Sequence, residues 1–349
     1  MCIRDSYNDL MLKILSHENV ASRAAIYESY DKNVQGRVVN ERGQTNAGVV
    51  APFDSKKFPE EIKDDCFSAA LAHNPSVGKI DPYLVAQHAV IEACAKTVSV
   101  GASPLALTDC LCFGNPEKPE QMWQFSQSCV AIREACALLH FSGTDNLPIV
   151  AGNVSFYNQS GNQSIPASPI IGCFGKASKE QVLMNGFSSS GANIYLVGEA
   201  PIFIGGSIVV DVLNIKNTKV KKVDVQEYSN MLNCVLKANS EGLLNSCSYV
   251  GLGGLATSLF KMSFVNNVGC SIEKDIDKNL LFSENFAFIV EVSKENSSAF
   301  EGALNKNSCA YKQIGKTNKS SKIVIKNFID LDVNQTKKTW ENALREKLQ

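Results

Sequence analysis

Two short runs of the sequence place oxygen-bearing side chains directly after apolar stretches. Residues 103–108 and 147–151 are mostly apolar, are bounded by Gly or Pro, and each predict a buried strand. Asp109 follows the first expected strand with a carboxylate, and Asn153 follows the second with an amide carbonyl. Hard cations such as Mg2+ take oxygen ligands of this kind, completed by phosphates and water. Because ligands bind where the strands of α/β sheets end, the pattern predicts a site for a Mg2+-bound nucleotide or phosphoester.

Two glycines favour the same interpretation, but an ordinary structural one accounts for most of the same residues. Gly114 and Gly152 lack a Cβ and would let the backbone approach a phosphate closely. Gly and Asn after a strand are also common turn residues, and the run 115–120 is typical of a helix start. The chemistry alone therefore leaves both a phosphate site and plain turns open.

The order of residues in the two runs resembles the signature of one enzyme family. The runs read Thr108-Asp-Cys-Leu-Cys-Phe-Gly-Asn-Pro-Glu-Lys-Pro-Glu120 and Ala151-Gly-Asn-Val-Ser-Phe-Tyr-Asn158. Both resemble signature segments of phosphoribosylformylglycinamidine synthases, and the first differs only at Cys112, where that family usually has Asn. Such agreement is far more specific than a lone glycine-rich loop. Weaker similarity extends from about Ile14 to Val292 and includes Asp81-Pro-Tyr83, Gly101-Ala-Ser-Pro104, Gly205-Gly-Ser207 and Leu281-Phe-Ser-Glu284.

The resemblance implies an α/β (α+β) fold made of a PurM-like two-domain unit, the unit shared with aminoimidazole ribonucleotide synthetase. Its N-terminal sheet domain forms a barrel with a partner copy, and its C-terminal α/β domain flanks that barrel. Synthases of this family resemble two tandem copies of the unit, and this chain resembles the second copy alone. The expected divisions are a non-native tail (1–6), a helical lead-in (7–36), an ATP and substrate domain (37–177), a C-terminal-type domain (190–330) and a C-terminal helical tail (331–349).

The reaction implied by the resemblance is an ATP-dependent ligation in purine biosynthesis. ATP phosphorylates the amide oxygen of formylglycinamide ribonucleotide, and ammonia then displaces phosphate to leave the amidine. The partners implied are the missing N-terminal half of the synthase, a glutaminase subunit that supplies the ammonia, and a small accessory subunit. ATP and Mg2+ are the implied cofactors, and the implied location is the cytoplasm.

Four positions match the family motif closely enough to take over its roles. Asp109 and Gly152 would contact ATP, Asn153 would bind Mg2+, and Ser155 would hydrogen-bond the substrate. No catalytic residue is expected, because the family's catalytic histidines lie in the first copy. The histidines present are His17, His73, His88 and His140, none of them in a matching motif. We expect His88 to be a packing or surface residue. The stretch 248–254 lacks the acidic residues often found there in the family, so a ligand role in it is doubtful.

Composition excludes several other classes of protein. The 349 residues are 44% hydrophobic and 20% charged, with a formal net charge of −1, which gives no electrostatic case for nucleic acid or an anionic membrane. No apolar run approaches the ~18 residues that a membrane span needs, and residues 1–10 lack a secretory apolar region. The twelve cysteines are expected to be small buried thiols. Cys110-Leu-Cys112 is a close pair without the two-residue spacing typical of zinc or redox sites.

The remaining pattern predicts the elements that must position these residues. Helices are expected at 8–31, 83–99, 119–140, 225–244, 255–266 and 335–347, and further strands at 37–53, 168–175, 193–198 and 286–292. The helix 119–140 carries an apolar stripe that we assign to the core. A polar stretch at 178–191, with a short helix in it, marks the domain boundary. The loop 141–148 is longer than the family's and suits the surface.

Three hypotheses of function remain open. The chain could be the C-terminal half of a synthase, inactive alone. It could be a nucleotide-binding or structural module with a degenerate site. It could also be a self-standing homodimeric ATP-dependent kinase or synthetase of the same superfamily, although the run 115–120 argues against this. A sheet that must pair with another copy exposes an edge and an apolar face in isolation, so we expect the lone chain to self-associate.

Overall fold

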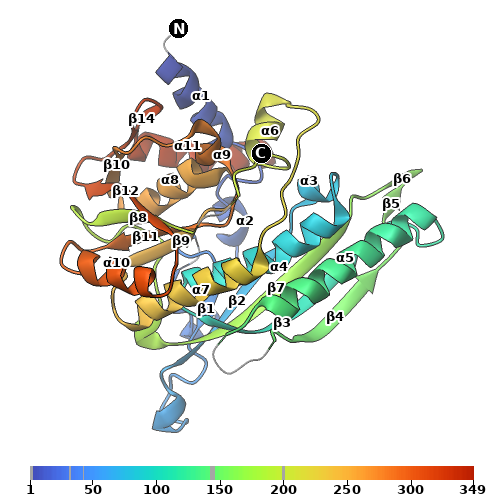
Figure 1. Ribbon diagram of the computed structural model, residues 1–349, viewed down its shortest axis with the longest axis horizontal. Coiled ribbons are helices and arrows are strands. Elements are labelled where there is room, and N and C mark those ends of the chain that lie inside the picture. Colours follow the sequence, from blue (N-terminus) through green and yellow to red (C-terminus); the bar gives the residue numbers. More distant parts are fainter. Residues whose placement is uncertain (1–2, 31–32, 42, 142–145, 199–200) are drawn as a thin grey trace.

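A computed structural model describes residues 3–30, 33–41, 43–141, 146–198 and 201–349. Its elements form two large sheets, a short hairpin and two layers of helices (Figure 1). None of the helices in these ranges is both long and apolar enough to cross a membrane. The cysteines in these ranges are all free thiols, and most of them are buried, as expected for small core residues.

The first sheet has five strands in the order β1-β2-β7-β3-β4. Its strands are β1 (Gly48–Val50), β2 (Asp65–Ala72), β3 (Ser103–Cys112), β4 (Ile149–Ser155) and β7 (Ser168–Ser178). β3 pairs antiparallel with β7 and parallel with β4, and β4 lies at the edge of the sheet. A separate hairpin joins β5 (Gln159–Ser160) to β6 (Gln163–Ser164).

Three helices cover one face of this sheet and leave the other face open. They are α4 (Pro82–Ser99), α5 (Pro119–Leu138) and α7 (Val225–Ser240), and Figure 1 shows them side by side above β7, β3 and β4. α4 begins at Pro82 because the Asp81 side chain accepts the backbone N–H of Leu84 at 2.8 Å. Strand β2 alternates strictly between buried and exposed residues, with Phe67 and Leu71 on the open face.

The second sheet has seven strands in the order β14-β13-β10-β12-β8-β11-β9. They are β8 (Asn193–Val197), β9 (Ser246–Tyr249), β10 (Gly269–Ile272), β11 (Phe288–Val292), β12 (Tyr311–Asn318), β13 (Lys322–Ile325) and β14 (Ile329–Asp332). One face, including Tyr195 and Phe288, joins the same hydrophobic core as α4, α5 and α7. Its other face, including Ile194 and Ile289, packs under α1 (Ile3–Leu15) and α8 (Gly254–Asn266). The molecule is therefore layered sheet, helices, sheet, helices.

The remaining helices are short or lie at the periphery. They are α2 (Ala24–Tyr27), α3 (Pro75–Gly78), α6 (Ile208–Leu213), α9 (Lys278–Phe282), α10 (Ser297–Lys306) and α11 (Val333–Leu348), with 3-10 turns at Val34–Gly36, Glu60–Ile62 and Lys179–Gln181.

The prediction of one helix over 8–31 is wrong, because α1 ends at Leu15 and α2 begins only at Ala24. Between α1 and α2, the Val20 carbonyl accepts the indole N–H of Trp340 at 2.7 Å, and Ser22 N–H donates to the Trp340 carbonyl at 3.0 Å. Contacts to α11, distant in sequence, thus satisfy the backbone groups that a helix would have used. Residues 3–6, part of the stretch expected to be a non-native tail, form the first turn of α1. Four residues of the expected long loop, 142–145, lie outside the described ranges.

His88 is a packing residue, as expected. It is 3% exposed, lies between the rings of Phe203 and Phe286, and its Nε2 is 2.9 Å from the Lys221 carbonyl oxygen. Burial lowers the pKa of His88 to about 4, while that carbonyl and the more distant Glu92 act in the opposite direction. The side chain is therefore neutral at pH 7.

Acidification from pH 7 to 5 is expected to remove about 2 kcal/mol of the free energy of unfolding through His88 alone. An unfolded histidine titrates near pH 6.5, so neutral His88 contributes its full stability above that pH and loses it as the pH falls towards 4. Urea unfolding at several pH values tests this, with His88→Gln as the comparison. The variant should show a shallower dependence of stability on pH, and equal slopes would contradict the assignment.

Candidate functional site

The two signature segments lie side by side in the first sheet. In the parallel pairing of β3 with β4, Asp109 lies opposite Gly152, Cys110 opposite Asn153, and Cys112 opposite Ser155. Residues 113–148, which include α5, separate β3 from β4 in sequence, and the pairing makes the two strands neighbours. All four predicted site residues are thus gathered at one edge of the sheet.

The expected location at strand ends is nevertheless wrong. β3 continues to Cys112 and β4 to Ser155, so Asp109, Gly152 and Asn153 lie within paired strands and not beyond them. The polar residues remain in the strands because β7 and β4 supply hydrogen-bonding partners for the backbone of β3 on both sides. Polar side chains do not end a strand whose pairing continues.

The side chains of the two predicted oxygen donors lie on opposite faces of the sheet. Asp109 shares the helix-covered face with Leu107 and Leu111, because residues two apart in a strand point the same way. Asn153 pairs with Cys110 and Ser155 with Cys112, which places both on the open face. The expectation that one cation site uses both the Asp109 carboxylate and the Asn153 amide is therefore not met by this arrangement.

Asp109 lines a cavity of about 410 Å³ between the sheet and α5. Cys129, Ile132 and Cys136 of α5 form the opposite wall, so the stripe assigned wholly to the core also borders a cavity. The N-terminal end of that stripe, Met122, is 44% exposed. Burial raises the pKa of Asp109, and a hydrogen bond from the backbone N–H of Asn153 partly offsets this.

Gly152 makes room for its neighbour on β3. A Cβ built at Gly152 would lie 2.7 Å from Oδ1 of Asp109 and 3.0 Å from Oδ2, so the carboxylate would have to shift. The absence of a side chain therefore makes room for the carboxylate. This is a physical reason for the glycine besides the predicted approach to ATP.

The open face carries a compact polar group on β3 and β4. Asn153 Nδ2 lies 3.5 Å from Cys110 Sγ, and the Sγ atoms of Cys110 and Cys112 are 3.7 Å apart. Asn158 Nδ2 donates to Ser155 Oγ at 3.1 Å, to the Ser155 carbonyl at 2.8 Å and to the Phe113 carbonyl at 3.1 Å. Asn158, the last residue of the second signature segment, therefore fixes the position of the Ser155 hydroxyl.

The run 115–120 is a helix entry, as the structural interpretation predicted. The Asn115 side chain accepts the N–H of Glu117 at 2.9 Å, and Pro119 begins α5. Gly114 N–H donates to the Gln121 side chain at 3.2 Å, so this glycine is engaged by the protein itself. Its predicted closeness to a phosphate gains no support from these contacts.

The stretch 248–254 is a structural junction between the two sheet domains. Asn46 Nδ2 donates to Ser248 Oγ at 3.1 Å and to Ser99 Oγ at 3.2 Å, joining β9 to the end of α4. Tyr249 donates from its hydroxyl to Glu92 at 2.9 Å. These hydrogen bonds join the two domains.

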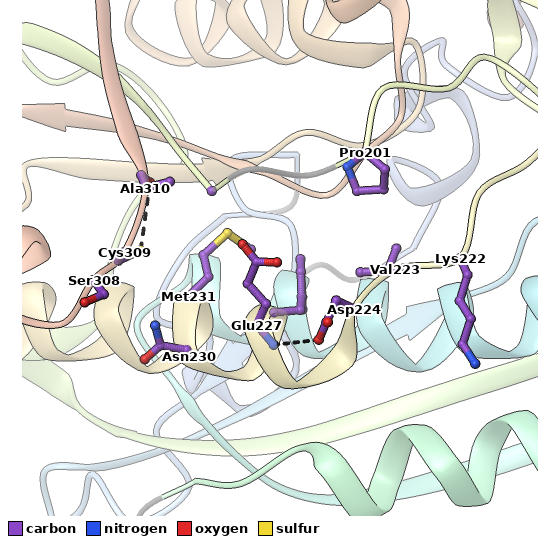
Figure 2. A pocket seen from close by; sticks show the side chains of 12 residues that line it. Pro201, Lys222, Val223, Asp224, Glu227, Asn230, Met231, Ser308, Cys309 and Ala310 are labelled. Atoms are coloured by element: carbon purple, nitrogen blue, oxygen red, sulfur yellow. Dashed lines mark hydrogen bonds between the residues drawn. The ribbon is translucent and has the colours of Figure 1, made fainter.

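A second cavity, of about 250 Å³, lies along α7 and is lined by none of the signature residues. Figure 2 shows Glu227, Asn230 and Met231 of α7 on one side of it and Pro201 on the other. Asp224, also in its wall, accepts the N–H of Glu227 at 3.0 Å and so caps α7. The Asp224 carboxylate at this cavity therefore has a structural role.

Two open sheets separated by a shared helix layer define a PurM-like two-domain α/β unit. The N-terminal domain of AIR synthase related proteins matches residues 46–177, and the C-terminal domain matches residues 189–326. The chain belongs to the AIR synthase related family.

Curated relatives of the chain come from the same enzyme family that the two signature segments resemble. The chain is 34% identical to phosphoribosylformylglycinamidine synthase subunit PurL of Campylobacter jejuni over 304 residues, covering 85% of this chain and 40% of that protein. It is 31% identical to subunit PurL of Methanothrix thermoacetophila over 354 residues, covering 98% of this chain and 45% of that one. The chain thus spans less than half the length of the curated relatives it matches.

Solved structures share the fold at low sequence identity. T. maritima PurL complexed with FGAR matches with a TM-score of 0.70 over 94% of this chain and 52% of that one, at 14% identity. Thiamine-monophosphate kinase from Stenotrophomonas maltophilia matches with a TM-score of 0.55 over 88% of this chain and 98% of the kinase, also at 14% identity. The two-domain unit therefore occurs both inside longer chains and as nearly the whole of shorter ones.

Proposed function

We propose that the chain is the second-copy half of a phosphoribosylformylglycinamidine synthase, an ATP-dependent ligase of purine biosynthesis. The complete enzyme would convert formylglycinamide ribonucleotide and ammonia to formylglycinamidine ribonucleotide. The observation that carries this proposal is the pairing of the two signature segments as adjacent strands, β3 and β4, in a chain 34% identical to a PurL subunit. The domain divisions 37–177 and 190–330 belong to the same proposal.

The site residues keep their proposed roles, now on two faces of one sheet. Asp109 and Gly152 would contact ATP where it passes the edge strand β4. Asn153 and Ser155 would meet Mg2+ and the ribonucleotide substrate on the open side. Asn153 suits a hard cation because it is exposed and its amide nitrogen donates to Cys110, which leaves the carbonyl oxygen for a ligand. Mg2+ would neutralise phosphate charge during phosphoryl transfer.

The chain would act only together with other proteins. The missing N-terminal half would supply the catalytic base, a glutaminase subunit the ammonia, and a small accessory subunit the link between them, all in the cytoplasm. The open face and the edge strand β4 support the proposal of a partner copy, because the described residues of this chain leave both uncovered.

Mixing experiments test the proposed function. The chain alone should show no synthase activity, and activity should return when a separately produced first half of a homologous synthase is added. With Asp109→Ala, the mixture should bind Mg2+-ATP about tenfold or more weakly, because a contact to a charged group is worth ~1.5–3 kcal/mol. Asp64→Ala, which removes an exposed carboxylate of the same domain, is the control. Failure of rescue when both halves are folded would argue against the proposal.

The open face should make the lone chain self-associate at micromolar concentration. Phe67 and Leu71 of β2 are 42% and 67% exposed, and Val150 of the edge strand is 64% exposed. Leu71→Lys places a charge on this apolar face and should weaken association at least tenfold. Light scattering after size-exclusion chromatography measures this, with Leu213→Lys, at a 51% exposed leucine of the second domain, as the control. A clean wild-type monomer would contradict the expectation.

A further inference from the structure

Two cysteines from distant parts of the sequence meet beside the cavity that lies along α7. Cys234 belongs to α7, and Cys309 lies in the turn between α10 and β12. Their thiols are hydrogen-bonded to each other. The two residues belong to the same hydrophobic core and are 5% and 6% exposed. The fold therefore brings two thiols into direct contact from two separate elements.

The cavity gives a small molecule a route to this pair. Cys309 lines the cavity of about 250 Å³, and Figure 2 shows it at the same end as Asn230 of α7. Cys234 lies one turn along α7 from Asn230, with its Sγ 4.0 Å from the Asn230 side-chain oxygen. By contrast, Cys94 and Cys173, whose thiols are also hydrogen-bonded to each other, are both 0% exposed. The pair at α7 is therefore the better placed of the two to react with a dissolved oxidant.

The two thiols at α7 differ in reactivity. The hydrogen bond with Cys309 lowers the pKa of Cys234; burial opposes this, and the nearby charge of Lys237 adds to it. The same hydrogen bond, followed by burial, raises the pKa of Cys309. Because the thiolate is the nucleophilic form of cysteine, Cys234 should react first and Cys309 second.

We propose that Cys234 and Cys309 form a reversible disulfide when the protein is exposed to hydrogen peroxide. The Cys234 sulfur attacks one peroxide oxygen, which breaks the O–O bond, leaves Cys234 as a sulfenic acid and releases one water. The Cys309 sulfur then bonds to the Cys234 sulfur, and the sulfenic oxygen leaves as a second water. Two thiols thus lose two electrons, and one peroxide is reduced to two waters. A thiol reductant restores both cysteines by exchange.

The backbone on the Cys309 side can supply the movement that the new bond requires. A disulfide brings its sulfur atoms to about 2.05 Å, closer than a hydrogen bond between thiols. Cys309 follows the exposed Ser308 in a turn, whereas Cys234 is held within a helix. The bond would tie α7 to the start of β12 at one end of the cavity. Neither cysteine belongs to the signature segments, so the proposal does not depend on the proposed ligase function.

Peptide mapping of the full chain tests the disulfide. Trypsin should release Cys234 in the peptide 223–237 and Cys309 in the peptide 307–312, each with a single cysteine. After treatment with a small excess of hydrogen peroxide, mass spectrometry without reductant should find these two peptides joined in most chains. Dithiothreitol should separate them. The oxidised chain should melt roughly 3–8 °C higher, because the link constrains the unfolded state.

Serine variants identify the role of each thiol. Cys234→Ser and Cys309→Ser should each abolish the joined peptides and the rise in melting temperature. Dimedone, which traps sulfenic acids, should label Cys234 in Cys309→Ser but should not label Cys309 in Cys234→Ser. Cys129→Ser, which removes a half-buried thiol on α5, should keep the disulfide. Peptides that stay separate in the oxidised wild type, or that join only to other cysteines or between chains, would overturn the proposal.

Discussion

Glu284→Ala is expected to lower the free energy of unfolding by roughly 2–6 kcal/mol, because it leaves two buried N–H donors without an acceptor at ~1–3 kcal/mol each. Oε1 of Glu284 accepts the N–H of Ile208 at 2.8 Å and that of Gly253 at 2.8 Å. Ile208 begins α6, and Gly253 caps α8, so one carboxyl group closes the N-terminal ends of two helices. Glu284 is only 5% exposed, which prevents water from replacing it.

Glu284→Gln is the matched variant for this residue, because its amide oxygen can still accept both N–H groups. Burial raises the pKa of Glu284 to about 8, although the two N–H donors act against this. An unfolded glutamate titrates near pH 4.3, so the wild type is stabilised at low pH and loses this stability as the pH rises through 8. Glu284→Gln should therefore lower the free energy of unfolding, relative to the wild type, by less at pH 9 than at pH 6. Urea unfolding at both values measures this, and alanine and glutamine variants of equal stability would refute the capping role.

Gly101→Ala should cost about 2–5 kcal/mol, combining left-handed strain of ~1–2 kcal/mol with overpacking of ~1–3 kcal/mol. Gly101 has φ +81° in the turn between α4 and β3. An added Cβ would overlap the backbone carbonyl oxygen of Gln181 and lie 2.7 Å from Nδ2 of Asn239. Since backbone cannot yield as a flexible side chain does, β3 and its Asp109 should shift as well.

Gly242→Ala separates the two causes of this loss. Gly242 has φ +69°, but a Cβ there meets nothing within 4 Å. It should therefore cost only the left-handed strain, about 1–2 kcal/mol. Thermal and urea unfolding of both variants give the comparison. Equal losses at Gly101 and Gly242 would show that the turn after α4 is not sterically restricted.

Most of the helices and strands that the sequence predicted are present, because periodicity and capping residues are local signals. The helix expected at 83–99 is Pro82–Ser99, and that at 119–140 is Pro119–Leu138. Strand pairing is not local, which explains the main error at the site. Nothing in the order of residues shows that β7 and β4 extend β3 past Asp109, or which face each side chain takes.

Single residues with distant partners were also beyond prediction. Glu284 stood out only as part of a segment that resembles a family, and its two helix caps appear only in three dimensions. The close approach of Cys110 and Cys112 likewise depends on the strand, which places residues two apart on one face of the sheet. The identities of these residues were visible, but their contacts were not.

The position of α1 sets the order in which parts of the protein can fold during synthesis on the ribosome. Met11 and Ile14 of α1 share a hydrophobic core with Ile314 and Ile325 of the second sheet. At ~5–20 residues per second, translation delivers that sheet about 15–60 s after the first helix. The first sheet can pair while synthesis continues, but α1 must wait with its apolar side uncovered. Nascent chains should therefore need a chaperone at their N-terminal helix until residues near 325 have emerged.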